Sequence, residues 1–162
     1  TAASTNTAKF RPTATGKAMF SVFKGVHENV VVEGEDVMRL VTLRSHDQYN
    51  TTIYAMDDRY RGVFGRRDVL FMNEQDMAAQ GLEHGDRVDI HTALPGSALT
   101  LRDITVVAYG IAPGTVGAYY PEANVLVPLN YLDEESGTPS YKSVPVRLTL
   151  RSKEIRPLAG GR

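Results

Sequence analysis

A chain of 162 residues is long enough to bury the core of one domain, and its 42% hydrophobic and 23% charged residues are typical of a soluble globular protein. A formal net charge of −1 excludes recruitment of nucleic acid or membrane by overall charge, and the lack of cysteine excludes disulfides, thiolate-held iron–sulfur clusters and cysteine metal ligands within this chain. No apolar run approaches the length of a membrane span and the first residues lack a signal-peptide core, so we expect a soluble, cytoplasmic protein without nucleic-acid or membrane partners.

The chain is expected to hold one domain between two short tails. Residues 1–9 and 156–162 bury little, which is typical of loose ends, and residues 10–155 form the domain. Fourteen glycines and eight prolines indicate many turns, which favours short strands over long helices. Strands are predicted, in chain order, at 16–23, 30–32, 38–43, 69–72, 87–92, 98–108 and 144–150.

Local signals add detail to this pattern. Asn73 is a candidate N-cap and Gly81 a stop signal, which together predict a short helix over residues 74–80. The alternation in 98–108 changes phase near Asp103, which indicates a bulge. Two further features are a turn at Pro113-Gly114 and a short buried piece at 125–128. Many short strands with one or two short helices predict a mainly β fold in the form of a compact barrel.

Four polar segments lie at the ends of predicted strands, at residues 44–54, 57–67, 119–124 and 133–142. A barrel gathers its connecting loops at a rim, so segments far apart in sequence can meet one ligand there. The first segment is the strongest candidate, because amides and hydroxyls beside an arginine can fix phosphate oxygens and the polar edge of a heterocycle. Its alternative is an ordinary polar connection between strands. Its candidate ligand residues are Arg44, His46, Gln48, Tyr49, Asn50 and Thr51.

The other polar segments carry weaker signals. Asn124 can recognise a pterin or purine edge through its amide, or it can form an Asx turn. Tyr141 and Lys142 stand at the start of the last strand, where a lysine can meet a phosphate or a carbonyl, or be a plain strand-edge residue. The segment 57–67 holds four arginines, but its two aspartates favour a solvated, self-paired surface loop over a phosphate site.

The sequence contains no standard catalytic or metal-binding motif. Its histidines, at 27, 46, 84 and 91, lack metal-ligand spacing, and there is neither a nucleophile elbow nor a glycine-rich phosphate loop. His84 is expected to be exposed in a turn, and His46 remains a ligand candidate only because of its neighbours. We therefore predict no metal ligand in this chain.

Six colinear pieces give the chain a resemblance to a known family. They are TATGKAMF at 13–20, LRSHDQYNT at 43–51, DDRYRG at 57–62, MNEQDMAAQGLEHGDRVDI at 72–90, YYPEANVLVP at 119–128 and SGTPSYKSVPVRL at 136–148. Together they resemble the C-terminal molybdopterin-dinucleotide-binding domain of the molybdopterin oxidoreductases, the group that includes formate dehydrogenases and their formate-dehydrogenase-like relatives. The resemblance implies a six-stranded double-psi β-barrel, which agrees with the strand-rich pattern.

The resemblance also implies a function. The cofactor would be molybdopterin guanine dinucleotide carrying molybdenum or tungsten, with the iron–sulfur cluster and the metal's protein ligand in preceding domains and no catalytic residue in this one. Residues 44–51 would hold pterin and phosphate groups, Asn124 would meet a polar edge, and Tyr141 with Lys142 would complete the pocket. Asn50 stands where many formate dehydrogenases have histidine, which favours the formate-dehydrogenase-like branch over formate itself as substrate.

We expect an excised domain whose partners are the remaining domains or subunits of the oxidoreductase, or else a small subunit like the cofactor-binding subunit of a formylmethanofuran dehydrogenase. The alternative is a stand-alone double-psi barrel used as a protein-interaction or substrate-recognition module, as in some ATPase N-terminal domains. One structural feature separates these hypotheses. A cofactor domain requires the polar segments to converge on one rim, whereas an interaction module exposes an apolar patch or groove.

Overall fold

The computed structural model describes residues 16–17, 34, 36–50, 54–133 and 136–153. The chain divides into two compact units, residues 1–31 and 32–162, and the fold given below is that of the second unit. Several predicted features lie outside the described residues: the strand at 16–23 except for Gly16 and Lys17, the strand at 30–32, and both tails.

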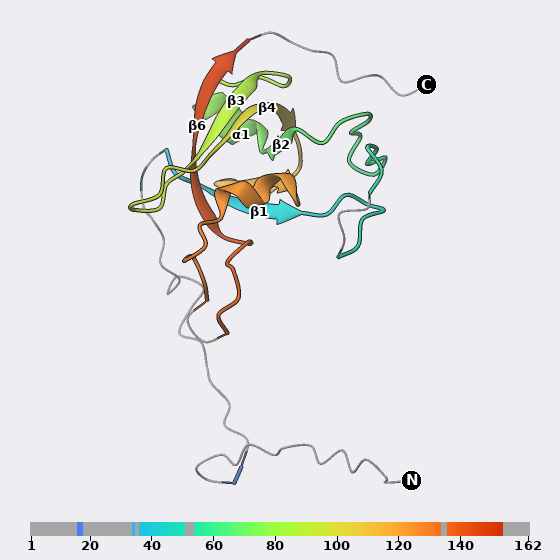
Figure 1. Cartoon of the computed structure of the whole chain (residues 1–162). Helices are drawn as coiled ribbons and strands as arrows, with labels where there is room; N and C mark the ends of the chain where they lie inside the picture. Colours follow the sequence, from blue (N-terminus) through green and yellow to red (C-terminus); the bar gives the residue numbers. More distant parts are fainter. Residues whose placement is uncertain (1–15, 18–33, 35, 51–53, 134–135, 154–162) are drawn as a thin grey trace, which may run out of the picture. The chain divides into compact units, whose positions relative to one another are not determined.

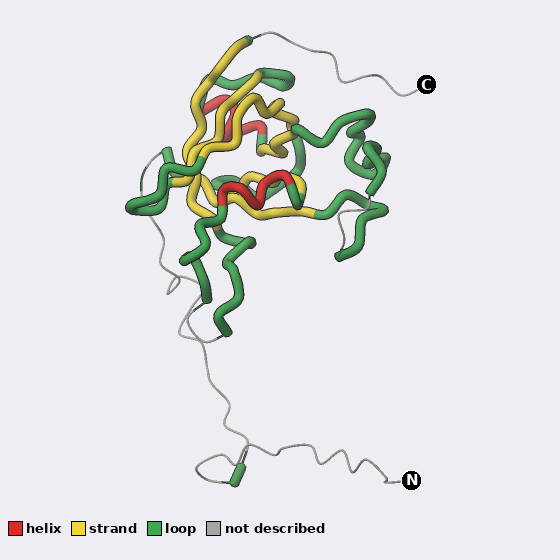
Figure 2. The backbone as a smooth tube through the Cα atoms, in the orientation of Figure 1, coloured by secondary structure: helices red, strands yellow, loops and turns green. Residues whose placement is uncertain are grey.

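Within the described residues, six strands form a closed barrel with two short helices, as predicted (Figure 1). Around the barrel the strands follow the order β1-β5-β2-β4-β3-β6, and β6 pairs with β1 to close it. The pairs β1–β5 and β2–β4 are parallel, and the remaining pairs are antiparallel. The strands are β1 (Met38–Leu43), β2 (Val69–Met72), β3 (Arg87–Thr92), β4 (Thr100–Ala108), β5 (Thr115–Tyr119) and β6 (Val144–Ser152). The helices, red in Figure 2, are α1 (Glu74–Ala79) and the 3-10 helix η2 (Glu122–Leu126).

Local sequence signals place helix α1 and the bulge in β4 correctly. The Asn73 side chain accepts the N–H of Gln75 at 2.8 Å, which caps the helix start. The chain leaves the helix through Gly81 at a φ of 66°, which glycine adopts without strain. Asp103 has a φ of 62°, and the β3–β4 register shifts between Val88 and Ile90, so the predicted bulge is confirmed.

Two apolar clusters form the core. The larger cluster fills the barrel and extends under η2, and it includes Leu40, Leu70, Ile90, Val106 and Leu126. β2 is buried on both faces, because Leu70 and Met72 belong to this cluster while Val69 and Phe71 belong to the other. The second cluster is formed by Val63, Val69, Phe71, Val107 and Tyr119, so it packs the segment 57–67 against the barrel wall.

Two elements differ from the prediction. Residues 115–119 form strand β5, which the sequence analysis missed because TVGAY follows a turn signal directly and lacks a clear alternation of apolar and polar residues. The prediction of a buried piece at 125–128 is only half right, because Leu126 is buried and Val127 packs against the larger cluster but Val125 is 48% exposed. Ala123 and Leu126 are the buried residues of η2, and their spacing of three residues suits a 3-10 helix.

The strand directions place three connections at one end of the barrel. From the pairing, β1, β3 and β5 run one way and β2, β4 and β6 run the other. The connections 44–68, 93–99 and 120–143 therefore all leave from the end at which β1 stops, and we call them the loop rim. The four polar segments of the sequence lie on, or lead into, the first and third of these connections. The topology thus brings them to one end of the molecule.

Candidate functional site

Arg67 lies at the centre of the loop rim. The residue is 4% exposed, and its guanidinium donates to Glu122 Oε1 (2.6 Å), Ser45 Oγ (2.8 Å) and the Tyr120 carbonyl (2.7 Å). The same guanidinium lies over the ring of Tyr54 at 3.7 Å. Arg67 therefore connects the loop after β1, the approach to β2 and the loop after β5.

The interpretation of 57–67 as a solvated, self-paired loop is only half right. Self-pairing is confirmed for Arg61, which lies 2.5 Å from Asp58. Solvation holds for Asp57 and Arg59, which are exposed, but not for Asp58, which is 1% exposed, or for Arg67, which is also buried. No local sequence signal could have shown this, since the carboxylate that pairs with Arg67 belongs to Glu122, 55 residues further along the chain.

Asp58 is a buried carboxylate with two strong donors. Arg61 Nη1 lies 2.5 Å from Asp58 Oδ2, and the Tyr119 hydroxyl donates to the same oxygen at 2.9 Å. Burial acts to raise the pKa of Asp58, but these hydrogen bonds and the charge of Arg61 hold the pKa below its ordinary value of 3.8. Burial and the neighbouring carboxylate raise the pKa of Tyr119, so its hydroxyl keeps the proton that it donates.

Acid should destabilise the fold through Asp58. Its folded-state pKa lies below the unfolded value, so this group stabilises the fold above that unfolded value, and the contribution is lost as pH falls through the folded pKa. We expect the free energy of unfolding to decrease below about pH 4, and Asp58→Asn to be less stable at neutral pH with a flatter acid profile. Denaturant unfolding across the acidic range measures both. The exposed neighbour Asp57→Asn is the control, and equal acid slopes for the wild type and Asp58→Asn would contradict the assignment.

The candidate residues that follow β1 are mostly exposed. Arg44, His46, Tyr49 and Asn50 are exposed, Tyr49 by 78%, and Thr51 lies outside the described residues. The ring of His46 lies against Tyr60, with centroids 3.7 Å apart. Arg44 makes no side-chain ion pair with any residue that the structure describes. This loop therefore offers to a ligand aromatic faces and a cation that has no ion-pair partner among the described residues.

Gln48 differs from these neighbours because it points inward. It is 4% exposed, its Nε2 donates to the Tyr120 carbonyl at 2.9 Å, and its Oε1 accepts from the Ser45 N–H at 3.2 Å and from Arg67 at 3.0 Å. Its amide is thus engaged by protein groups on both ends. The side chain fixes the shape of the loop that carries Arg44.

Tyr141 and Lys142 lie beside the end of β1. The Tyr141 carbonyl accepts the Thr42 N–H at 3.1 Å, and Lys142 Nζ donates to the Thr42 carbonyl. Burial, followed by the charge of Arg44, lowers the pKa of Lys142 below its ordinary value. Lys142 has no carboxylate partner within the described part of the chain. Two cations far apart in the sequence therefore lie within electrostatic reach of one another here, and neither forms an ion pair with a described residue.

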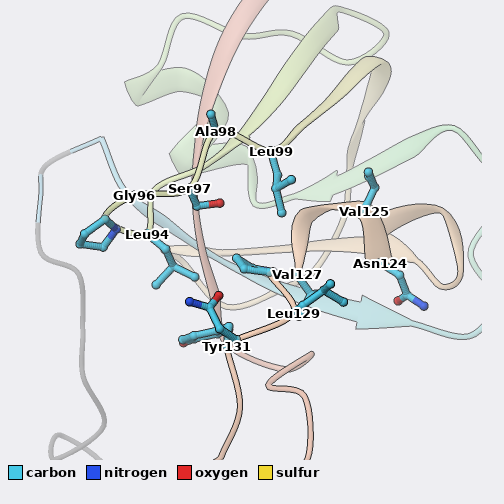
Figure 3. Close-up of a pocket in the computed structure, with 13 residues that line it drawn as sticks. Leu94, Gly96, Ser97, Ala98, Leu99, Asn124, Val125, Val127, Leu129 and Tyr131 are labelled. Atoms are coloured by element: carbon cyan, nitrogen blue, oxygen red, sulfur yellow. The ribbon is translucent and has the colours of Figure 1, made fainter.

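Asn124 lies on η2, next to an open cavity (Figure 3). Its backbone N–H donates to the Pro121 carbonyl and its carbonyl accepts the Val127 N–H, which is the 3-10 pattern. Its Oδ1 is buried and has no hydrogen-bond partner among the described residues, so the Asx-turn alternative is wrong. A buried acceptor without a donor is destabilising unless a ligand or partner supplies one.

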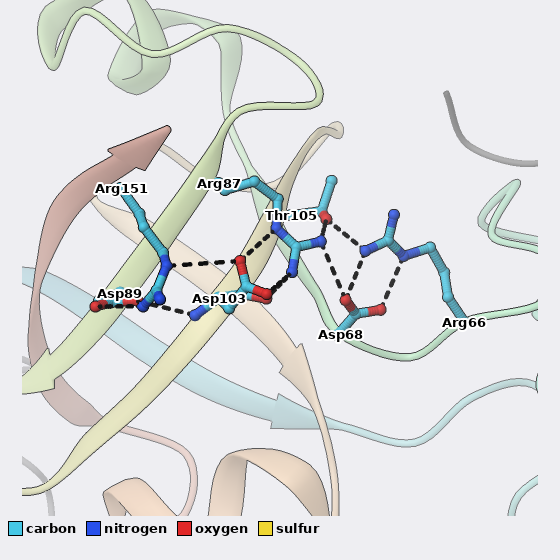
Figure 4. A network of polar contacts seen from close by, with 7 residues as sticks. All are labelled: Arg66, Asp68, Arg87, Asp89, Asp103, Thr105 and Arg151. Atoms are coloured by element: carbon cyan, nitrogen blue, oxygen red, sulfur yellow. Dashed lines mark hydrogen bonds and ion pairs between the residues drawn. The ribbon is translucent and has the colours of Figure 1, made fainter. Parts of the chain in front are cut away.

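A second polar cluster, on the barrel wall, contrasts with the rim because its charges compensate one another (Figure 4). Arg87 lies 2.6 Å from Asp103 and 3.3 Å from Asp68, and Asp89 accepts the N–H of Asp103 at 2.8 Å. Arg66 and Arg151 complete a set of three arginines and three aspartates. The cluster supports the bulge at Asp103 and leaves no surplus cation for a ligand.

Other kinds of site find no support in the part of the chain that the structure describes. No three histidine, aspartate or glutamate residues there are placed to hold a metal ion. His84 is exposed, as predicted, and accepts the Ala108 N–H at 3.2 Å. None of the described helices has the length and apolar character needed to cross a membrane.

Among the described residues, the rim thus holds two cations without an ion-pair partner, Arg44 and Lys142, and an Asn124 oxygen without a donor, groups that suit an anionic ligand with N–H donors. A closed barrel with such a rim is a ligand-binding barrel domain. The chain belongs to the Molydopterin dinucleotide binding domain family, whose model matches residues 38–145. The matched region runs from β1 into β6, so it contains the whole rim.

Longer proteins contain a similar domain. The chain is 48% identical over 141 residues to the uncharacterized oxidoreductase Rv2900c of Mycobacterium tuberculosis (strain ATCC 25618 / H37Rv) and 42% identical over 139 residues to Protein YdeP of Escherichia coli (strain K12). Both alignments cover 84% of this chain but 18% of the relative, so the chain spans less than a fifth of the curated relatives it matches. Its fold is similar to Acetylene Hydratase from Pelobacter acetylenicus, with a TM-score of 0.52 and 14% identity, over 70% of this chain and 18% of that one. This likeness is consistent with the double-psi barrel.

Proposed function

We propose that this chain is the cofactor-binding domain of a cytoplasmic, formate-dehydrogenase-like molybdenum oxidoreductase, and that its loop rim contacts molybdopterin guanine dinucleotide. The observation that carries the proposal is that Lys142 binds the end of β1 within the electrostatic influence of Arg44, and that neither cation pairs with a carboxylate among the described residues. Two cations held close together repel one another, and a bound phosphate relieves that repulsion.

Arg44 and Lys142 contact the phosphates in this proposal. The forked guanidinium of Arg44 can donate two parallel hydrogen bonds to one phosphate, while the ammonium of Lys142 acts as a point charge beside it. Asn124 accepts an N–H from the edge of the pterin or the purine through its partnerless Oδ1. The remaining candidates on the rim, His46, Tyr49, Asn50, Thr51 and Tyr141, border the same ligand.

Gln48 and Arg67 have a supporting role in the proposal. Gln48 is hydrogen-bonded at both ends of its amide and Arg67 is buried, so neither is available to a ligand. Together they hold the loop of Arg44 next to the chain that leads into η2. Asn50, at the position where many formate dehydrogenases have histidine, favours a formate-dehydrogenase-like enzyme with a substrate other than formate.

The cofactor, when bound, supplies the redox chemistry through its metal, molybdenum or tungsten. The residues of this chain bind and orient it and exclude water from one side. The iron–sulfur cluster belongs to other parts of the protein, because this chain has no cysteine. We therefore assign no catalytic residue to the chain, which is a domain of a larger polypeptide or a subunit beside one.

The assignment of the cofactor contacts can be tested with variants of the complete gene product. We expect the double variant Asn124→Ala, Lys142→Ala to bind the dinucleotide more weakly by about 1–3 kcal/mol for each residue, because each substitution leaves a polar group of the bound cofactor without its partner. Metal and pterin content per polypeptide, measured after purification, reports the loss without relying on turnover. The exposed Lys153→Ala is the matched control. Unchanged cofactor content in the double variant would mean that these residues are ordinary surface groups.

A further inference from the structure

The cavity beside η2 differs in chemistry from the cation pair. The loop 94–99 and the segment 124–131 surround an open space of about 650 Å³ (Figure 3). Its walls are largely apolar, with Leu94, Leu99 and Val127 among them, and none of the described residues that line it is acidic or basic. A space without a charged group does not suit a phosphate or a carboxylate. Its occupant should therefore be uncharged.

The lip of this cavity exposes apolar side chains to water. Leu129 is 97% exposed and Val125 48%, and both residues line the cavity. Single exposed apolar residues are common on protein surfaces, but a group of them beside an apolar hollow marks a place where another surface binds. The lip therefore extends the apolar wall outward, as in a docking groove.

Ser97 adds a polar requirement. Its Oγ and Asn124 Oδ1 are the two buried side-chain atoms without a hydrogen-bond partner in the described part of the chain, and both residues line this cavity. In Figure 3 the hydroxyl of Ser97 points to the side on which Leu99 lies, and Asn124 is drawn apart from it on η2. We treat the two atoms separately: Asn124 is assigned to the cofactor in the proposed function, and Ser97 Oγ lacks a partner that a segment bound in the groove can supply.

We propose that this groove is an interdomain docking site, filled by an extended, apolar and uncharged segment of the larger oxidoreductase whose backbone bonds to Ser97. The inference rests on the proposed function, because it takes the chain to be one part of a larger protein. The relatives support this occupant, since more than four fifths of their length lies outside the aligned domain. An extended segment also brings apolar side chains together with regularly spaced N–H and C=O groups, which matches both the walls and Ser97.

Hydrogen–deuterium exchange compares the 162-residue chain with the complete gene product. We expect peptides that cover 94–99 and 124–132 to exchange at least about tenfold more slowly in the complete protein, because the docked segment covers them. Leu129→Asp should abolish this protection and make the domain easier to release by limited proteolysis. Leu129 is almost fully exposed, so the variant should leave the stability of the isolated chain unchanged. Leu150→Asp, on β6 and 42% exposed, is the matched control and should change neither readout.

Several results would overturn the docking proposal. Equal exchange of these peptides in the two proteins would do so, as would a gene that encodes no further polypeptide. A 162-residue chain that dimerises, and becomes monomeric on Leu129→Asp, would identify a second copy as the occupant instead. Pterin content separates this outcome from the proposed function. If the complete protein retains pterin but its peptides show no protection from exchange, only the docking proposal is refuted. If the Lys142 variant loses pterin while the peptides stay protected, the docking proposal is unaffected.

Discussion

Replacing Arg67 with methionine should lower the free energy of unfolding by about 3 kcal/mol, because it leaves a partly buried carboxylate without its counter-ion. Glu122 would lose both bonds from the guanidinium, and Ser45 and the Tyr120 carbonyl would lose their donor. We also expect faster amide exchange in residues 44–50, since Arg67 connects that loop to the segment before η2. Denaturant unfolding and hydrogen exchange of the purified chain measure the two effects.

Two further variants help to interpret the stability of Arg67→Met. Arg59→Met removes an exposed arginine from the same segment and should change stability by less than about 0.5 kcal/mol. Arg67→Lys keeps the charge but cannot form the forked set of bonds, so it should lie between methionine and the wild type. A loss of less than about 1 kcal/mol for Arg67→Met would show that water or neighbouring groups replace the guanidinium, and that the loops hold together without it.

Truncating Phe71 to alanine should have an effect of similar or larger size, about 3–5 kcal/mol, because a fully buried ring is removed from the second core cluster. Phe71 packs edge to face on Tyr119, with centroids 5.4 Å apart, and Val63 of the segment 57–67 lies in the same cluster. The cavity would therefore loosen both the barrel wall and the segment that carries Arg67.

Substitutions of decreasing size at Phe71 test how the loss of stability depends on the buried volume that is removed. Phe71→Leu keeps much of the buried volume and should lose less than about 1.5 kcal/mol. In Phe71→Ala the Tyr119 hydroxyl should also bind Asp58 less firmly. The dependence of stability on acidic pH should therefore become flatter, as we expect for Asp58→Asn. Thermal or denaturant unfolding at neutral and acidic pH gives both readouts. If Phe71→Ala is no less stable to unfolding than Phe71→Leu, the surrounding side chains must move to fill the space left by the ring.

Elements with a strong local pattern were predictable from the sequence. The strands at 38–43, 69–72 and 87–92 were predicted with their observed bounds, and α1 to within one residue, because alternation and capping act over a few neighbouring residues. β5 was missed, since its identity as a strand depends on pairing with β1 and β2 more than on its own residues. The 3-10 helix η2 was missed for a similar reason, because its turn is fixed by packing against the barrel.

The candidate site was predictable only in outline. The polar composition of the loops pointed to Arg44, Asn124 and Lys142 as candidate ligand groups, and the resemblance to a family added the kind of ligand they suit. Whether each side chain points outward or inward was not accessible, because Gln48 and Arg44 lie in the same polar run and differ only in their tertiary neighbours.

The sequence by itself determined the class of fold, the lack of cysteine-based chemistry and the family, because these depend on composition, on short-range periodicity and on motifs that remain colinear along the chain. Only the tertiary structure decided which polar groups are already used by the protein. Arg67 and Glu122, 55 residues apart, pair across the loop rim, whereas Arg44 and Lys142 influence one another and have no carboxylate partner among the described residues. Hydrogen bonds and charges act over a few ångströms, so the pairing of distant residues follows from the order and direction of the strands and cannot be read from local sequence.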